Sequence, residues 1–139
     1  MSTEVTATVL LPKPRSLVRQ YLIGRWTKPD MTGVVAARVV AGAEAHSGPA
    51  RTILPAFDAA VTNGDAATGT NDEQAFEVEA HGVLWRYTLQ ALDERTTRVQ
   101  MAWVQANWVG KLPGIRAFMT KGIERERTRL ERWASTGAE

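Results

Sequence analysis

Glu126 and Tyr87 are the two residues whose types and positions suggest chemistry. Glu126 lies near the centre of the apolar face of an expected amphipathic helix. A carboxyl group buried there could act as a general acid or base, or could hold a polar group of a ligand. The alternative is structural, with Glu126 paired to Arg129 three residues later or reaching water.

Tyr87 shares the apolar face of an expected strand with Trp85, so its hydroxyl must find a partner in apolar surroundings. The hydroxyl could donate a hydrogen bond to a ligand carbonyl, with Glu126 as the base. The alternative, an ordinary core tyrosine bonded to backbone, is favoured because buried hydroxyls are usually satisfied within the protein.

Gly122 precedes Glu126 by one turn and predicts a notch in the same helix face. The notch could admit a ligand, or it could let Trp85 or Trp103 approach the helix. Trp26, in a segment over residues 24–33 expected to be a loop or a second short helix, could cap a cavity mouth or fasten that segment. The candidates for ligand binding are Trp26, Phe76, Trp85, Trp103, Met119, Gly122 and Ile123, of which Phe76 and Trp103 fit an ordinary core better.

Other kinds of site have little support in the sequence. The chain has no cysteine and only two histidines, His46 in an expected turn and His81 on a polar strand face. Phosphate-binding glycine loops, zinc-protease motifs and nucleophile elbows are absent. We therefore expect no metal and no cofactor.

Length and charge are those of one ordinary domain, and we assign residues 1–139 to it. The net charge is +2, and the basic residues of the last helix alternate with glutamates, which indicates an ion-paired surface. We expect no nucleic-acid binding. The start of the chain does not resemble a signal peptide and no stretch is apolar enough to cross a membrane, so we expect a cytoplasmic protein without membrane insertion.

Residues 111–134 form the clearest expected element, a helix with Pro113 in its first turn. Its apolar stripe contains Leu112, Ile115, Met119, Ile123, Leu130 and Trp133. At the other end of the chain, alternation predicts a strand over residues 4–11. A short helix over residues 15–23 is expected to stop at Gly24.

The middle of the chain carries strand and turn signals. We expect a strand over residues 34–43, a turn over residues 45–49 and one or two strands over residues 51–61. Asn63 and Gly64 suggest a hairpin turn, after which residues 66–70 could pair back.

Alternation is clearest in residues 74–80, in residues 83–92 and around Val99, Met101 and Trp103. Strands joined by short turns predict an antiparallel meander with one apolar face. The terminal helix would fill the concave side of this twisted sheet, which predicts an α+β fold.

Four features of the sequence occur together: the opening strand with residues 12–18, Trp26 before Pro29, residues 85–89 leading to residues 96–99, and residues 112–116. In these features the chain resembles the helix-grip, or START-like, SRPBCC superfamily, which includes polyketide cyclase/dehydrase and lipid-transfer domains. The resemblance implies a curved antiparallel sheet wrapped around a long C-terminal helix, with a hydrophobic cavity between them. Catalytic residues differ among branches of this superfamily, so the resemblance assigns none.

The expected function is binding of a hydrophobic small molecule, polyketide-like or lipid-like, between sheet and terminal helix. An enzyme of this kind would be a cofactor-free cyclase, aromatase or dehydratase in biosynthesis, with Tyr87 and Glu126 moving protons. The alternatives are a carrier, a sensor, a sequestering resistance protein, or an interaction module whose core is filled. If Glu126 faces a cavity, Glu126→Gln should alter affinity with little loss of fold, whereas unfolding would indicate a structural ion pair. The sequence does not define the oligomeric state.

Overall fold

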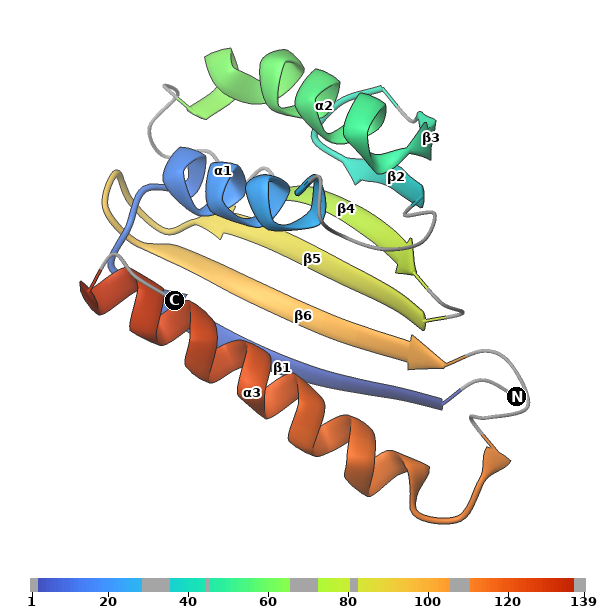
Figure 1. Ribbon diagram of the computed structural model, residues 1–139. Coiled ribbons are helices and arrows are strands. Elements are labelled where there is room, and N and C mark those ends of the chain that lie inside the picture. Colours follow the sequence, from blue (N-terminus) through green and yellow to red (C-terminus); the bar gives the residue numbers. More distant parts are fainter. Residues whose placement is uncertain are drawn as a thin grey trace.

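A curved antiparallel sheet with helices on one face forms the architecture (Figure 1). The computed structural model describes residues 3–28, 36–44, 46–65, 73–80, 83–105 and 111–136. In chain order the elements are β1 (Thr3–Leu11), α1 (Arg15–Trp26), β2 (Ala36–Ala41), β3 (Ser47–Pro49), α2 (Ala50–Asp65), β4 (Glu73–Ala80), β5 (Val83–Ala91), β6 (Thr97–Gln105) and α3 (Ile115–Thr136). This arrangement confirms the expected α+β class, with an open sheet and a long C-terminal helix.

The six strands lie in the order β1-β6-β5-β4-β2-β3, and every pairing is antiparallel. The register places Tyr87 of β5 between Phe76 of β4 and Met101 of β6. It also places Trp85 opposite Trp103. The alternation read from the sequence therefore brings the aromatic residues of three strands onto one face.

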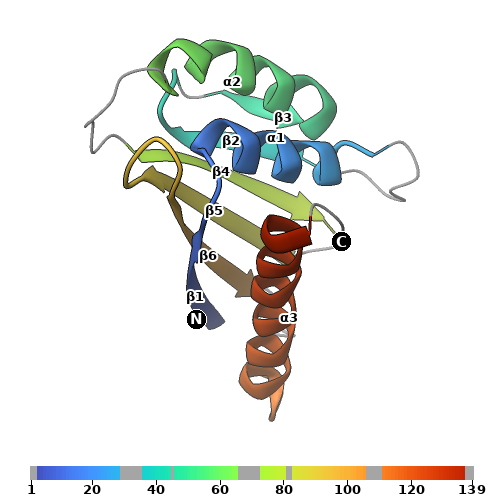
Figure 2. The same cartoon turned by 90° about the vertical axis from the view of Figure 1, so that its left-hand side faces the viewer.

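All three helices of the described chain cover that apolar face (Figure 2). α3 packs along β1 and β6, while α1 contacts β5 and α2 contacts β2 and β3. The opposite face has no helix over it in the described part of the chain. Its central feature is Glu77, which is held by Arg38 and Arg86.

α3 confirms the long terminal helix but begins at Ile115, after Gly114 with φ +80°. Pro113 therefore precedes the helix, and the expectation that it occupies the first turn is wrong. Gly114 adopts a left-handed conformation that residues with a side chain rarely take, and this ends the preceding turn. The face toward the sheet buries Met119, Ile123, Glu126, Leu130 and Ala134.

α1 is longer than the sequence predicts. It does not stop at Gly24 but continues to Trp26. A glycine inside a helix costs about 1 kcal/mol relative to alanine. Here the side chains of Arg25 and Trp26 both make tertiary hydrogen bonds beyond the helix, which offset that cost. The loop expected around Trp26 is therefore wrong, and in place of a second short helix the first helix continues through Trp26.

α2 contradicts the strands expected over residues 51–61 and the hairpin turn at Asn63 and Gly64, because α2 runs through both. Pro55 suggested an edge strand, yet the buried residues Ala50, Leu54, Phe57 and Val61 follow helical spacing. Their packing outweighs the hydrogen bond that Pro55 removes from the helix.

The remaining differences are small. Residues 47–49 belong to β3, paired with β2, so the turn expected over residues 45–49 is partly a strand. The strands expected over residues 4–11, 34–43, 74–80 and 83–92 match β1, β2, β4 and β5 within a few residues. Residues 66–70 and His81 lie outside the described residues.

Candidate functional site

Glu126 is buried at the junction of α1, α3 and the sheet, and its main partner is Arg25. The Arg25 Nη2 atom donates to Glu126 Oε2 at 3.0 Å, and Arg25 Nη1 donates to Oε1. Only 7% of the Glu126 side chain and 13% of the Arg25 side chain is exposed. Arg129, the partner expected from the sequence, approaches Oε2 only to 3.9 Å. The expected contact within the helix is thus present, but the paired contact with Arg25 of α1 is the closer one.

Tyr87 joins this ion pair to Trp26. The Trp26 Nε1–H donates to the Tyr87 hydroxyl at 3.1 Å, and the hydroxyl donates to Glu126 Oε1 at 3.4 Å. Tyr87 is fully buried. The burial of Tyr87 is that of a core tyrosine, the alternative favoured from the sequence. Its hydrogen-bond partners, however, are the side chains of Trp26 and Glu126 and not backbone groups. Both roles of the hydroxyl, donor and acceptor, are used inside the protein.

The network alters the proton affinity of two members. Burial raises the pKa of the Tyr87 phenol above its ordinary value, and the negative charge of Glu126 raises it further. Burial works to lower the pKa of Arg25, but the hydrogen bond and charge of Glu126 outweigh burial and leave that pKa raised. Tyr87 is therefore neutral and Arg25 charged throughout the physiological range.

The raised pKa of Tyr87 predicts a loss of stability in alkali. The folded state holds the phenolic proton more tightly than the unfolded chain, whose tyrosine pKa is about 10. This contribution is fully present below about pH 10 and is lost as the pH rises further. Urea unfolding of wild type and Tyr87→Phe between pH 8 and pH 11 should show the stability difference shrinking above pH 10. A difference that stays constant with pH would contradict this account.

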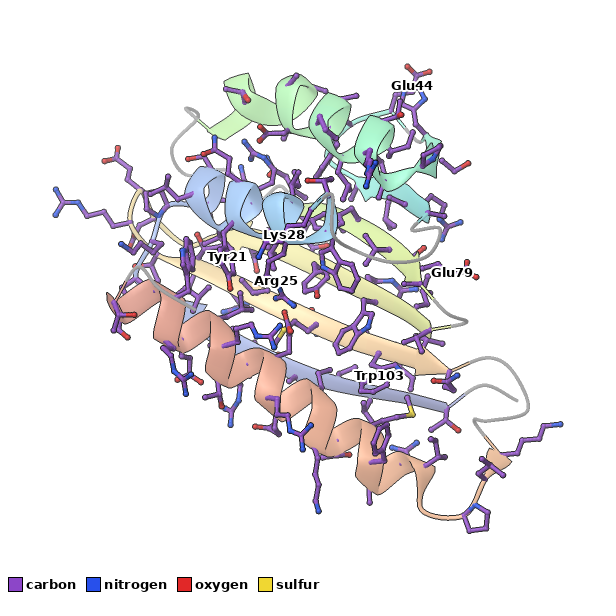
Figure 3. All side chains as sticks on the ribbon, viewed as in Figure 1. Tyr21, Arg25, Lys28, Glu44, Glu79 and Trp103 are labelled. Carbon is purple, nitrogen blue, oxygen red and sulfur yellow. The ribbon has the colours of Figure 1, made fainter. Side chains whose placement is uncertain are left out.

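A row of aromatic rings runs from this network toward solvent. The Trp26 ring lies 6.5 Å from Trp85, Trp85 lies 4.8 Å from Trp103, and Trp103 meets Phe118 edge-on at 5.9 Å. Trp85 and Trp103 are half-buried, whereas Phe118 is 62% exposed. Figure 3 shows Arg25 between α1 and α3, and Trp103 beside the N-terminal half of α3. We name Trp85, Trp103 and Phe118 the aromatic row.

The notch at Gly122 is occupied by Trp103. A Cβ atom at Gly122 would lie 2.2 Å from Trp103 Cζ3. Of the two alternatives, the close approach of a tryptophan is the one found. Trp103 therefore lies directly against the α3 backbone, which holds one end of the aromatic row in place.

The other candidate residues divide between core and surface. Phe76, Met119 and Ile123 are almost fully buried and belong to the core. His46 is exposed, with its Nε2 3.9 Å from a carboxylate oxygen of Glu44. The functional roles of Phe76, Met119 and Ile123 stay predictions.

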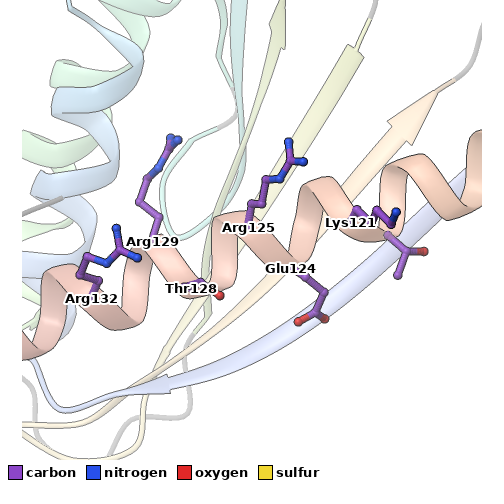
Figure 4. A pocket seen from close by; sticks show the side chains of 7 residues that line it. Lys121, Glu124, Arg125, Thr128, Arg129 and Arg132 are labelled. Carbon is purple, nitrogen blue, oxygen red and sulfur yellow. The ribbon is translucent and has the colours of Figure 1, made fainter.

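The hollows of the described surface include two that neither Glu126 nor Tyr87 lines. One, of about 830 Å³, runs along α3 and is lined by Thr120, Lys121, Glu124, Arg125, Thr128, Arg129 and Arg132 (Figure 4). The other, of about 510 Å³, lies against β2, β3, β4 and β5 and includes Arg38 and Glu77. Tyr87 and Glu126 are both buried, whereas the aromatic row reaches the surface at Phe118.

The sequence pattern singles out neither Arg25 nor Phe118. Arg25 lies 101 residues from Glu126 in the chain, and a helix assumed to end at Gly24 gave it no fixed direction. Its place in the last turn of α1, beside Trp26, was the available signal. Phe118 lies off the buried stripe of α3, so periodicity alone assigned it no partner.

Neither a metal cluster nor a membrane span is found in the described ranges. No group of three or more histidine or carboxylate side chains among the described residues could hold a metal ion. No helix in that part of the chain is long and apolar enough to cross a membrane.

Comparison with known proteins gives distant structural likenesses only. No protein-family model matches the chain, and no curated protein is similar to it in sequence. Among solved structures, the chain is similar to the Zhui aromatase/cyclase from Streptomyces sp. R1128. The two share 14% sequence identity with a TM-score of 0.40, over 99% of this chain and 93% of that chain. The site is accordingly interpreted from its own residues.

Proposed function

We propose that the protein binds a hydrophobic small molecule with a planar ring system against the aromatic row, beside the N-terminal half of α3. The observation that carries the proposal is the continuous contact from half-buried Trp85 and Trp103 to exposed Phe118. Exposed aromatic rings in contact with one another offer stacking surfaces that water satisfies poorly. Such surfaces suit fused or conjugated rings, as in polyketide-like molecules, better than a flexible acyl chain.

The buried network supports binding more than proton transfer. Tyr87 donates to Glu126 and accepts from Trp26, while Glu126 is held by two hydrogen bonds from Arg25. A general acid or base must reach the proton that it moves. We therefore assign Trp26, Tyr87, Glu126 and Arg25 to support of the aromatic row, and propose a carrier, sensor or sequestering protein ahead of a cyclase or dehydratase.

Titration with the neutral probe N-phenyl-1-naphthylamine tests this proposal. We expect saturable binding with a stoichiometry of one, detected by probe fluorescence and by energy transfer from tryptophan. Phe118→Ser should weaken binding about five- to tenfold, because an aromatic contact and its buried area are lost. Native mass spectrometry of protein from its own host would then identify the natural ligand.

Leu10→Ser is the matched control, since Leu10 is 58% exposed on β1 and its neighbours alternate to the helix-covered face. It should leave probe binding unchanged. Absence of saturable binding to folded protein, or equal loss in both variants, would refute a ligand site at the aromatic row.

A further inference from the structure

Basic and acidic residues alternate along the sequence of α3, but on the exposed side of the helix their side chains gather on different flanks. Arg127 bonds Glu124 Oε2 at 2.6 Å and lies 4.0 Å from Glu131. Both of these glutamates are thereby drawn to one flank of the helix. On the other side, Lys121, Arg125 and Arg132 form no ion pair with any described residue. The ion-paired surface expected from the sequence is thus only half of this helix.

Cationic side chains continue the line of the aromatic row along α3. Phe118, Gly122, Arg125 and Arg129 are spaced so that they follow one another along a single side of α3. Phe118 contacts Trp103, and Trp103 lies on Gly122. The next two positions in the line are arginines. The row from Phe118 to Arg129 spans about 16 Å of helix, with an apolar half followed by a cationic half.

The hollow along α3 gives this cationic half an accessible surface. Arg125 and Arg129 line it, and Figure 4 shows them with Arg132 projecting from the same side of the helix, with Glu124 on the opposite side. Glu126 offsets this charge only in part, because its Oε2 lies 3.9 Å from Arg129 Nη1 and its hydrogen bonds are made to Arg25. The guanidinium groups of Arg125 and Arg129 can therefore attract an acidic group that enters the hollow.

We propose, resting on the function proposed above, that the ligand carries an acidic group bound by Arg125 and Arg129 while its rings lie on the aromatic row. The planar fork of a guanidinium group matches a carboxylate, sulfonate or phosphate group. Long polyanions fit less well, because Glu124 also lines the hollow and would repel a continuous phosphate backbone. The assigned ligand class is an apolar ring system with one acidic substituent.

Two probes with nearly the same rings test the assignment. N-phenyl-1-naphthylamine is neutral, and 1-anilinonaphthalene-8-sulfonate adds one sulfonate group. Both are titrated against wild type and Arg125→Gln/Arg129→Gln. The double variant should weaken sulfonate binding about tenfold, as expected for losing a charged hydrogen-bonded contact, and leave the neutral probe unchanged. Added salt should likewise weaken only the sulfonate in wild type.

Arg98→Gln serves as the control, because Arg98 is exposed on β6, bonds Gln90 and does not line the hollow. It removes one charge and should shift neither probe. Equal effects of the double variant on both probes, or none on the sulfonate, would overturn the acidic group while the neutral titration still supports the aromatic row. Failure of both probes to bind wild type would refute the proposed function and this inference together.

Discussion

Glu126→Gln is expected to lower the free energy of unfolding by about 3 kcal/mol, because it leaves the largely buried Arg25 guanidinium without its counter-charge. The glutamine amide can still accept from Tyr87, but its NH2 group would face a guanidinium donor. Of the two outcomes distinguished from the sequence, the contacts of Arg25 therefore favour the structural one. Urea unfolding followed by circular dichroism measures the loss.

Glu124→Gln makes the same chemical change two residues earlier on α3. Glu124 is 47% exposed and pairs only with half-exposed Arg127, so its loss should cost under about 1 kcal/mol. Arg25→Met/Glu126→Leu should recover most of the stability lost in Glu126→Gln, since replacing both partners by apolar groups leaves no buried charge. Equal stability of the two glutamine variants would show that the Arg25 pair adds little.

Gly122→Ala is expected to destabilise the protein by about 1–2 kcal/mol, against the usual gain when alanine replaces a helical glycine. The new Cβ would lie 2.2 Å from Trp103 Cζ3, so the indole or the helix must move. Overpacking of this kind costs about 1–3 kcal/mol, which exceeds the roughly 1 kcal/mol of helix propensity that alanine contributes. Movement of Trp103 away from Trp85 should also change the near-ultraviolet circular dichroism spectrum.

Gly24→Ala is the comparison variant, and its expected change in stability has the opposite sign. Gly24 is exposed within α1, and a Cβ atom added there would meet no atom of another element within 4 Å. Alanine should therefore stabilise the protein by up to about 1 kcal/mol. A stabilising Gly122→Ala would contradict the close packing of Trp103 on α3.

The strands and the terminal helix could be predicted because their burial follows a simple period. In β5 and β6 the apolar residues alternate, and in α3 Met119, Ile123 and Leu130 recur at helical spacing. The sequence does not predict α2, because Pro55 and the Asn63–Gly64 pair are strong local signals for a strand and a turn. Packing of Leu54, Phe57 and Val61 outweighs them, and that packing depends on elements distant in the chain.

In the candidate site, too, local sequence patterns identify some residues, whereas others depend on contacts between elements distant in the chain. Glu126 and Tyr87 were found from their positions on apolar faces, and the structure brings their side chains together. Arg25 could not be paired with Glu126 from the sequence, because nothing local fixes how α1 crosses α3. That crossing depends on contacts such as the stacking of Tyr21 on Trp133 at 4.3 Å.

The pairing of β1 with β6 has a consequence for synthesis of the chain on the ribosome. Thr3 pairs with Gln105, so the first strand made must wait for the last strand of the sheet. At about 5–20 residues per second this delay is roughly 5–20 s, and α3 follows later still. A nascent chain of this protein therefore exposes the apolar residues of β1 for seconds. We expect folding to be slow and chaperone-assisted until α3, which packs on β1, has emerged from the ribosome.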